Sequence, residues 1–484
     1  MKVPSILLSF LVAALLPALA ASAAVDNSYA IVVSRETQGD TEWKKVVSKL
    51  EFRHPGARIH IWEKSVGEVL GGLQKQFPRH IALVARPAEV TIEFVRDTHL
   101  LTRKLDDDPY TDAFWGIITG ADAANALQMA SESKPLTIRK VASGTEVELD
   151  RCESGVWYCE LKQGRMVMKE KGGQPTPGKA PADTTEALAK TLTEYQADLF
   201  ITSGHATERD WQIGYTYKNG FWRSKDGQLY GLDTSKRRID IISPNPKVYM
   251  PIGNCLMGHI DGPDAMALAF LKSAGVRQML GYVKPTWYGY QGWGCLDYFV
   301  EQPGRFTFAE AFFANHHALI HRLQSICPEA SRVTEVDSMG RTKTPLSLGA
   351  SASALGLGRM DLQGLLFDRD VVVFYGDPAW QAKMAEGTCS WKQELVEKDG
   401  SYEFTVTPAL GSRSFSKVNK NGAQRGGRPI IQFLPHRIEV TSLKLTSGAD
   451  RNPVVTDGFI LLPLPRESET TPITVKFTAK RIVE

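Results

Sequence analysis

Short apolar runs alternate with longer amphipathic stretches between Tyr29 and Ala130. The runs are rich in Ile, Val and Ala and predict buried strands, whereas apolar residues that recur every three or four positions predict helices. Strands that alternate with helices of about ten residues or more are typical of a parallel sheet with helices on its faces. The predicted strands are 30–33, 58–62, 81–84 and 115–118, and the predicted helices are 42–52, 66–77, 90–105 and 121–130.

The hydrophobic pattern changes further along the chain. Apolar and polar residues alternate with a period of two at 135–168, which predicts a β-rich excursion. A run that contains glycine and proline at 172–178 is typical of a linker. Helical spacing returns at about Asp183 and opens a second α/β unit. From about Ser390 onward, short alternating runs separated by turn residues predict a small all-β sandwich.

The N-terminus has the pattern of a secretory signal peptide. Lys2 precedes a short apolar run at 6–20, and the small residues Ala21-Ser22-Ala23-Ala24 follow that run. A basic start, an apolar core and a small-residue end are typical of a cleaved leader. The run is shorter than the ~20 residues that span a membrane. We expect a secreted or periplasmic protein that has no membrane association once the signal is removed.

These patterns divide the chain into four predicted parts. They are a signal peptide at 1–24, an N-terminal α/β subdomain with the β-rich excursion at 25–170, a second α/β subdomain at 180–388 and an all-β domain at 390–484. A chain of 484 residues that is 43% hydrophobic and 23% charged lies in the globular range. The formal net charge of +3 is too small to indicate a nucleic-acid partner.

Six cysteines in 484 residues are too few for a disulfide scaffold. Cys152 and Cys159 flank the segment Glu-Ser-Gly-Val-Trp-Tyr, which we interpret as the tip of a hairpin. We therefore predict a disulfide between these two residues. The sequence does not pair the other four, which are Cys255, Cys295, Cys327 and Cys389.

Two apolar runs in the second α/β unit end in chemically reactive side chains. The run at 199–202 leads through Ser203-Gly204 to His205, and the run at 248–252 leads through Gly253-Asn254 to Cys255. Both runs predict buried strands, and the carboxyl ends of parallel strands are where α/β sheets place their sites. The imidazole precedes the thiol by 255 − 205 = 50 residues.

A thiol and an imidazole at the ends of neighbouring strands are the minimum for a cysteine nucleophile with a histidine base. A peptide carbonyl attacked by the thiolate would need backbone N–H donors for its oxyanion, and the N–H groups of Ala206 and Cys255 are the candidates. The structural alternative is that Cys255 is a small buried apolar residue and His205 an ordinary loop residue.

Several blocks of the sequence resemble the gingipains, bacterial cysteine peptidases of the caspase-like superfamily. Their order along nearly the whole mature chain carries this resemblance, and caspases likewise place the histidine about 50 residues before the cysteine. The blocks are Asp108-Pro109-Tyr110-Thr111-Asp112, Ser203-Gly204-His205, Asn254-Cys255-Leu256-Met257-Gly258, the 267–271 helix that leads to Gly275, and Tyr375-Gly376-Asp377-Pro378-Ala379.

The resemblance implies a caspase-like three-layer α/β/α sandwich of two subdomains, followed by an immunoglobulin-like β-sandwich. It implies an endopeptidase that cleaves proteins or peptides through an acyl-enzyme on Cys255, with His205 as the general acid and base. It implies no catalytic cofactor and allows a structural calcium ion. It also implies a carboxylate from the first subdomain near the histidine, for which Asp112 and Asp122 both remain open. The family has glycine after the histidine, whereas Ala206 stands there in this chain.

Other interpretations of the chemistry remain. The alternative function is a non-catalytic, adhesive protein that binds peptide or glycan on a degenerate caspase-like scaffold. We expect no metal centre at His316, His317 and His321, because no glutamate adjoins this set and no further ligand is evident. We likewise expect none at His259, four residues after Cys255. An acidic pocket would select a basic substrate side chain, and the candidates downstream of the thiol are Asp261, Asp264 and Asp297.

Overall fold

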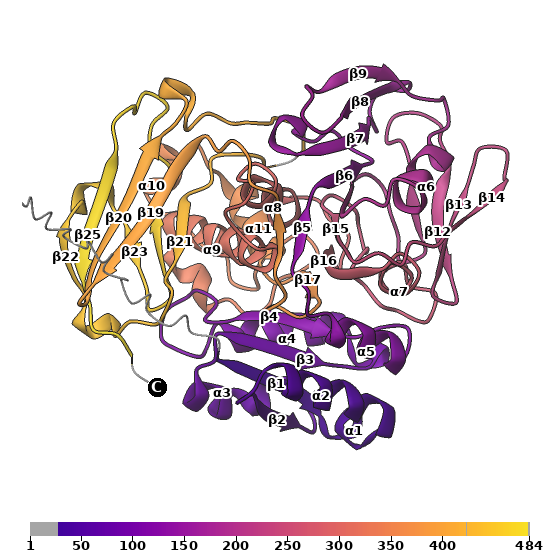
Figure 1. Ribbon diagram of the computed structural model, residues 1–484. Coiled ribbons are helices and arrows are strands. Elements are labelled where there is room, and N and C mark those ends of the chain that lie inside the picture. Colours follow the sequence, from indigo (N-terminus) through magenta and orange to yellow (C-terminus); the bar gives the residue numbers. More distant parts are fainter. Residues whose placement is uncertain (1–27, 423, 483–484) are drawn as a thin grey trace, which may run out of the picture.

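The computed structural model describes residues 28–422 and 424–482 (Figure 1). The signal peptide predicted at 1–24 therefore lies outside the described residues. Among the helices described, none combines the length and the apolar character that crossing a membrane requires.

A sheet of twelve strands forms the centre of the molecule, and Figure 1 shows it extending from β2 at the bottom to β9 at the top. Its inner strands are short apolar runs that are buried on both faces, as a sheet covered by helices requires. In spatial order the strands are β2 (Arg58–Trp62), β1 (Tyr29–Ser34), β3 (His80–Val84), β4 (Phe114–Ile118), β17 (Val372–Tyr375), β16 (Val276–Tyr282), β15 (Lys247–Pro251), β10 (Leu199–Thr202), β6 (Lys140–Ser143), β7 (Ser154–Tyr158), β8 (Arg165–Lys169) and β9 (Thr176–Lys179).

The direction of the strands reverses in the middle of this sheet. β17 pairs parallel with β4 but antiparallel with β16. β15, β10, β6 and β7 all continue parallel to β16. The carboxyl ends of β10 and β15 consequently lie at the same edge of the sheet as the amino end of β4.

Helices cover both faces of the sheet. On one face, α5 contacts α7 through a hydrogen bond from Asn125 Nδ2 to the Leu271 carbonyl (3.1 Å). On the other face, α4 contacts α9, where the rings of His99 and His316 lie 5.2 Å apart. The helices are α1 (Arg35–Gly39), α2 (Thr41–Arg53), α3 (Leu70–Gln76), α4 (Ile92–Thr102), α5 (Ala123–Ser131), α6 (Thr185–Thr193), α7 (Met266–Lys272), α8 (Tyr290–Phe299), α9 (Phe308–Ile326), α10 (Ser351–Ala354) and α11 (Arg359–Asp368).

Two smaller sheets flank the central one. The segment between the two key strands forms an antiparallel sheet of β11 (Asp210–Gln212), β12 (Phe221–Lys225), β13 (Gln228–Leu232) and β14 (Arg238–Ile241), which packs on α6 and α7. β5 (Leu136–Ile138) pairs with β18 (Ala382–Met384).

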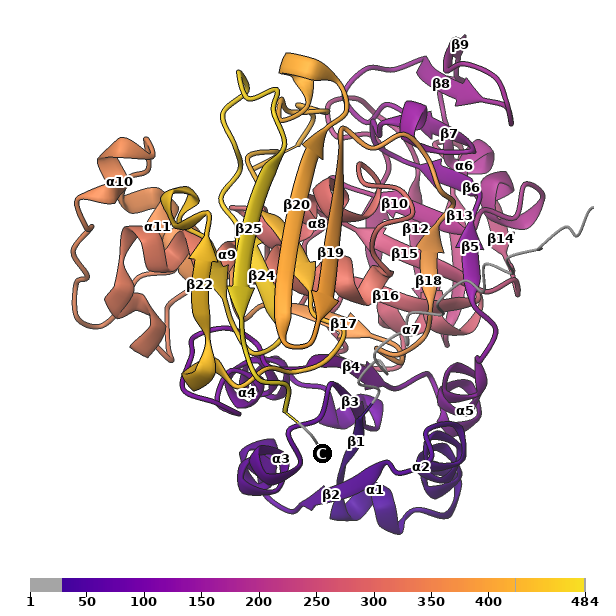
Figure 2. The same ribbon diagram turned by 60° about the vertical axis from the view of Figure 1, so that its left-hand side comes forward.

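The C-terminal part is a sandwich of two antiparallel sheets, seen from its four-stranded side in Figure 2. Phe404, Val475 and Phe477 lie in its core. The three-stranded sheet packs against α9, where His317 stacks on Phe459 at 4.4 Å. One sheet contains β19 (Trp391–Lys398), β20 (Ser401–Pro408), β25 (Ile473–Thr478) and β22 (Lys444–Ser447); the other contains β21 (Ile430–Phe433), β24 (Phe459–Leu462) and β23 (Val454–Val455). The predicted fold class, a three-layer α/β/α sandwich followed by an immunoglobulin-like β-sandwich, is confirmed.

The predicted disulfide between Cys152 and Cys159 is wrong, since both residues are free thiols. The segment between them is strand β7 and not a hairpin tip; the turn comes after it, between β7 and β8. Seven residues of extended chain separate the two Cα atoms by roughly 20 Å, whereas a disulfide needs about 6 Å. Cys152 Sγ instead donates to the Glu148 carbonyl (3.6 Å), and Cys159 Sγ to the Glu146 carboxylate (3.2 Å).

Candidate active site

Strands β10 and β15 are neighbours, and their paired ends carry His205 and Cys255 to one edge of the sheet. The register runs from Leu199 opposite Val248 to Thr202 opposite Pro251. The Ile252 N–H then donates to the Thr202 carbonyl (2.9 Å), so the pairing continues beyond the strands. The histidine loop and the cysteine loop therefore leave the sheet side by side.

Asn254 joins these two loops from within. Its side chain is fully buried. Oδ1 accepts a hydrogen bond from the Thr202 hydroxyl (2.6 Å), and Nδ2 donates to the Gly204 carbonyl (3.1 Å). Gly204 has a φ of +95°, which bends the chain just before the histidine. Asn254, which precedes Cys255, thus fixes the backbone at Gly204, which precedes His205.

Cys255 lies on a turn with an unusual backbone. The next residue, Leu256, has a φ of +59°, a left-handed conformation that non-glycine residues seldom adopt. Such conformations concentrate at functional sites, because the surrounding structure must hold them in place. The Thr286 N–H donates to Cys255 Sγ at 3.2 Å, from the loop that follows β16. A backbone N–H aimed at sulfur is complementary to a thiolate.

The His205 side chain is exposed and stacks on the ring of Tyr215, with centroids 4.6 Å apart and planes at 27°. Its carbonyl accepts from the Gln212 N–H (2.9 Å). In the part of the chain that the structure describes, no hydrogen bond joins the His205 ring to the Cys255 thiol. Such bonds are often loose without substrate and tighten in the complex.

Ala206 forms an isolated antiparallel bridge with Trp211. The bonds that flank this bridge use the N–H groups of Thr207 and Gln212. In such a pair the N–H of the central residue points away from the partner strand, so that of Ala206 is not consumed by the bridge. The extended backbone also accommodates the alanine methyl group where the resemblance implies glycine.

The two carboxylates predicted to orient the histidine lie elsewhere. Asp122 is the N-cap of α5 and accepts from the Asn125 N–H (2.8 Å), beyond the carboxyl end of β4 and thus at the opposite edge of the sheet. Asp112 precedes β4 at the same edge as Cys255, but three strands away, roughly 14 Å. Its carboxylate accepts from the Leu105 N–H (2.9 Å).

A carboxylate that the sequence reasoning missed, Glu160, lies beside the histidine strand. It is 5% exposed and accepts hydrogen bonds from Ser203 Oγ (3.2 Å) and from the Thr145 hydroxyl. Burial raises the pKa of Glu160. The N–H of Tyr215, whose ring stacks on His205, donates to the Glu160 carbonyl (2.7 Å). The period-two excursion supplies this residue, because β6 and β7 continue the sheet next to β10.

The three aspartates proposed to line an acidic substrate pocket each have a basic partner. Asp261 pairs with Arg209 (2.6 Å) and Asp264 with Lys225 (2.8 Å). Asp297 is buried and pairs with Arg425 (2.7 Å). Of the histidines considered as metal ligands, His259 contacts Glu208 at 3.0 Å, and His316 and His317 are buried on α9.

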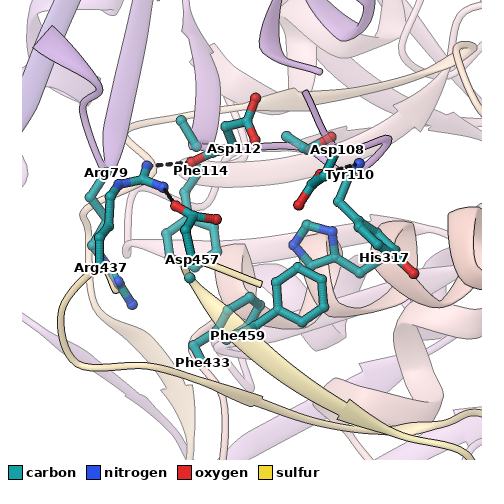
Figure 3. A pocket seen from close by; sticks show the side chains of 13 residues that line it. Arg79, Asp108, Tyr110, Asp112, Phe114, His317, Phe433, Arg437, Asp457 and Phe459 are labelled. Carbon is teal, nitrogen blue, oxygen red and sulfur yellow. Dashed lines mark hydrogen bonds and ion pairs between the residues drawn. The ribbon is translucent and has the colours of Figure 1, made fainter. Parts of the chain in front are cut away.

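A small pocket opens where β4, α9 and the β-sandwich meet (Figure 3). Carboxylate oxygens of Asp106, Asp108 and Asp112 lie within 4.8 Å of one another. Burial, followed by repulsion from neighbouring carboxylates, raises the pKa of Asp112 to about 9 and that of Asp108 to about 7. Clustered carboxylates of this kind fit a hard cation such as calcium.

A histidine and an arginine complete this acid pocket. Figure 3 shows the His317 ring facing the Asp108 carboxylate. His317 is 2% exposed, and its Nδ1 has no hydrogen-bond partner among the described residues. Arg437 forms an ion pair with Asp457 and donates to the Asp112 carbonyl. The acid pocket is therefore separate from the site around Cys255, and its carboxylates give it a different chemistry.

No protein-family model matches the sequence, and no curated protein is detectably similar to it. Among solved structures, the chain is similar to the Arg-specific cysteine proteinase gingipain R, with a TM-score of 0.43, 10% identity, and coverage of 94% of this chain and 97% of that one. It is similar to the complex of Porphyromonas gingivalis RgpB pro- and mature domains, with a TM-score of 0.41, 9% identity, and coverage of 94% and 99%. These values are too low to transfer residue roles.

Proposed function

We propose that the protein is a secreted cysteine endopeptidase in which Cys255 is the nucleophile and His205 the general acid and base. The observation that carries the proposal is the Asn254 bridge, which locks the histidine loop to the cysteine loop at one edge of the sheet. The left-handed Leu256 and the Thr286 N–H directed at the sulfur support the same assignment.

The chemistry follows from this placement. His205 takes the thiol proton, and the Cys255 sulfur forms a bond to the carbonyl carbon of a substrate peptide. The N–H groups of Ala206 and Cys255 stabilise the resulting oxyanion. The carbon–nitrogen bond then breaks, and His205 returns the proton to the leaving amine. Water hydrolyses the thioester and releases the acid and the free thiol.

Cleavage of a mixed peptide library tests the proposal. We expect wild-type protein to hydrolyse peptides and Cys255→Ala to lose hydrolysis entirely. Cys389→Ala is the matched control, because Cys389 is also partly exposed and should leave the rate unchanged. Iodoacetamide should alkylate Cys255 much faster than Cys389. Equal alkylation rates together with no cleavage would instead favour a peptide-binding or glycan-binding protein.

We propose in addition that the acid pocket holds a structural calcium ion through Asp106, Asp108 and Asp112. The support is the mutual approach of these oxygens in a buried place, where like charges repel without a cation. The ion would neutralise the cluster and would take no part in peptide hydrolysis. Calcium titration followed by thermal unfolding tests this, with Asp107→Asn as the control because Asp107 is exposed beside the cluster.

A further inference from the structure

Two side-chain contacts bridge the histidine loop and the cysteine loop beyond the reactive residues. Glu208 lies three residues after His205, and His259 lies four residues after Cys255. Glu208 Oε1 contacts His259 Nδ1 at 3.0 Å, and the two side chains are 23% and 18% exposed. The second pair, Arg209 with Asp261 at 2.6 Å, is more exposed, at 42% and 34%.

Hydrogen bonds hold the backbone at both ends of the Glu208–His259 contact. The Met266 N–H, at the start of α7, donates to the Glu208 carbonyl (2.7 Å). The Tyr375 hydroxyl donates to the carbonyl of Gly258, next to His259 (2.7 Å). A contact between two anchored groups transmits more constraint than one between freely rotating side chains, because less conformational entropy opposes it.

The two loops are therefore joined on both sides of the reactive residues. Asn254 joins them before His205 and Cys255, and the Glu208–His259 pair joins them after these residues. The separation of imidazole and thiol depends on both connections. A displacement of about 1 Å between reacting groups can lower a rate by about 10²-fold.

We infer that Glu208 and His259 are positioning residues that hold His205 at its working distance from Cys255. The inference rests on the proposed function. Glu208 contacts the His259 ring from the histidine loop, and Arg209 and Asp261 form the second contact between the same two loops.

The kinetics of peptide hydrolysis test this role. We expect Glu208→Gln to lower kcat about tenfold with little change in KM. His259→Ala removes the same contact from the other loop and should lower kcat by a similar factor. Arg209→Gln is the matched control for charge removal at the same interface and should change kcat less than twofold.

Alkylation of Cys255 by iodoacetamide provides a second measurement that does not require peptidase activity. Glu208→Gln should shift the pH profile of the alkylation rate, since it moves the imidazole relative to the thiol, whereas Arg209→Gln should not. If the wild type alkylates normally but cleaves no peptide, the proposed function fails and the alkylation profile still decides the positioning role. Identical kinetic effects of Glu208→Gln and Arg209→Gln, or an effect on thermal unfolding alone, would overturn the inference.

Discussion

The two polar regions at one edge of the central sheet are built in opposite ways. Around Cys255, hydrogen bonds and ion pairs cross between loops, and each acidic candidate there has a basic partner. Around Asp112, the partly buried carboxylates of Asp106, Asp108 and Asp112 lie close together, and their pKa values are raised, chiefly by burial. The first region is held by contacts between complementary groups, whereas the second gathers several carboxylates next to Arg437.

The largest effect is expected from removing the Asn254 side chain, which joins the histidine loop to the cysteine loop in the first region. Asn254→Ala removes the side-chain partner of the Gly204 carbonyl and leaves the Thr202 hydroxyl only its bond with Tyr249, which lowers the free energy of unfolding by about 1–3 kcal/mol. Peptide hydrolysis should fall about 10²-fold because the loops separate. Urea denaturation and kcat/KM measure the two losses. An Asn254→Ala enzyme with wild-type kcat/KM would remove the main support for the proposed site.

Calcium should distinguish the second region from the first. At a calcium concentration of 100 Kd, the free energy of unfolding should rise by about 2.7 kcal/mol. Asp112→Asn should abolish most of this gain, whereas Asp107→Asn and Asn254→Ala should preserve it. Calorimetry with and without a chelator measures the difference. A gain that survives Asp112→Asn would place the calcium elsewhere.

The pH dependence of stability sharpens the same contrast. The folded pKa of Asp112, about 9, lies above the unfolded value near 3.9, so the folded state binds the extra proton. Stability is therefore lost as pH rises toward 9, by at most about 1.4 kcal/mol per pH unit for this group. Without calcium, wild type should lose more stability than Asp112→Asn between pH 7 and 9.

Comparison with that variant is necessary because Lys247, whose pKa burial lowers to about 7, contributes a slope of the opposite sign in this window. Adding calcium should remove the difference between the two proteins in how steeply stability falls with pH. Parallel unfolding curves for wild type and Asp112→Asn without calcium would contradict the picture of a repulsive cluster.

The smallest effect is expected outside both regions. Because Cys152 and Cys159 are separate thiols, a reducing agent should change the free energy of unfolding by less than about 0.5 kcal/mol. A disulfide that closed a short loop would contribute about 3 kcal/mol instead. Thiol titration of the denatured protein checks the count of six free cysteines.

Local patterns in the sequence predicted the strands of the first α/β unit, the strands of the β-sandwich and the two runs that end in His205 and Cys255. Such features depend on residues close together in the chain. The positions of Asp112 and Asp122, both away from His205, could not be predicted, because they depend on the strand reversal beside β17, a pairing between distant segments. Glu160 was missed for the same reason: its excursion extends the sheet next to β10 only after folding.

The position of β17 also has a consequence for how the protein is made. This strand, Val372–Tyr375, is translated long after β4 and β16, yet it lies between them. Until it emerges from the ribosome, both neighbours present unpaired edges that favour intermolecular pairing. The nascent chain cannot complete its sheet from the N-terminus onward. We therefore expect fragments that end before residue 372 to aggregate, and the chain to depend on chaperones during synthesis until β17 is available.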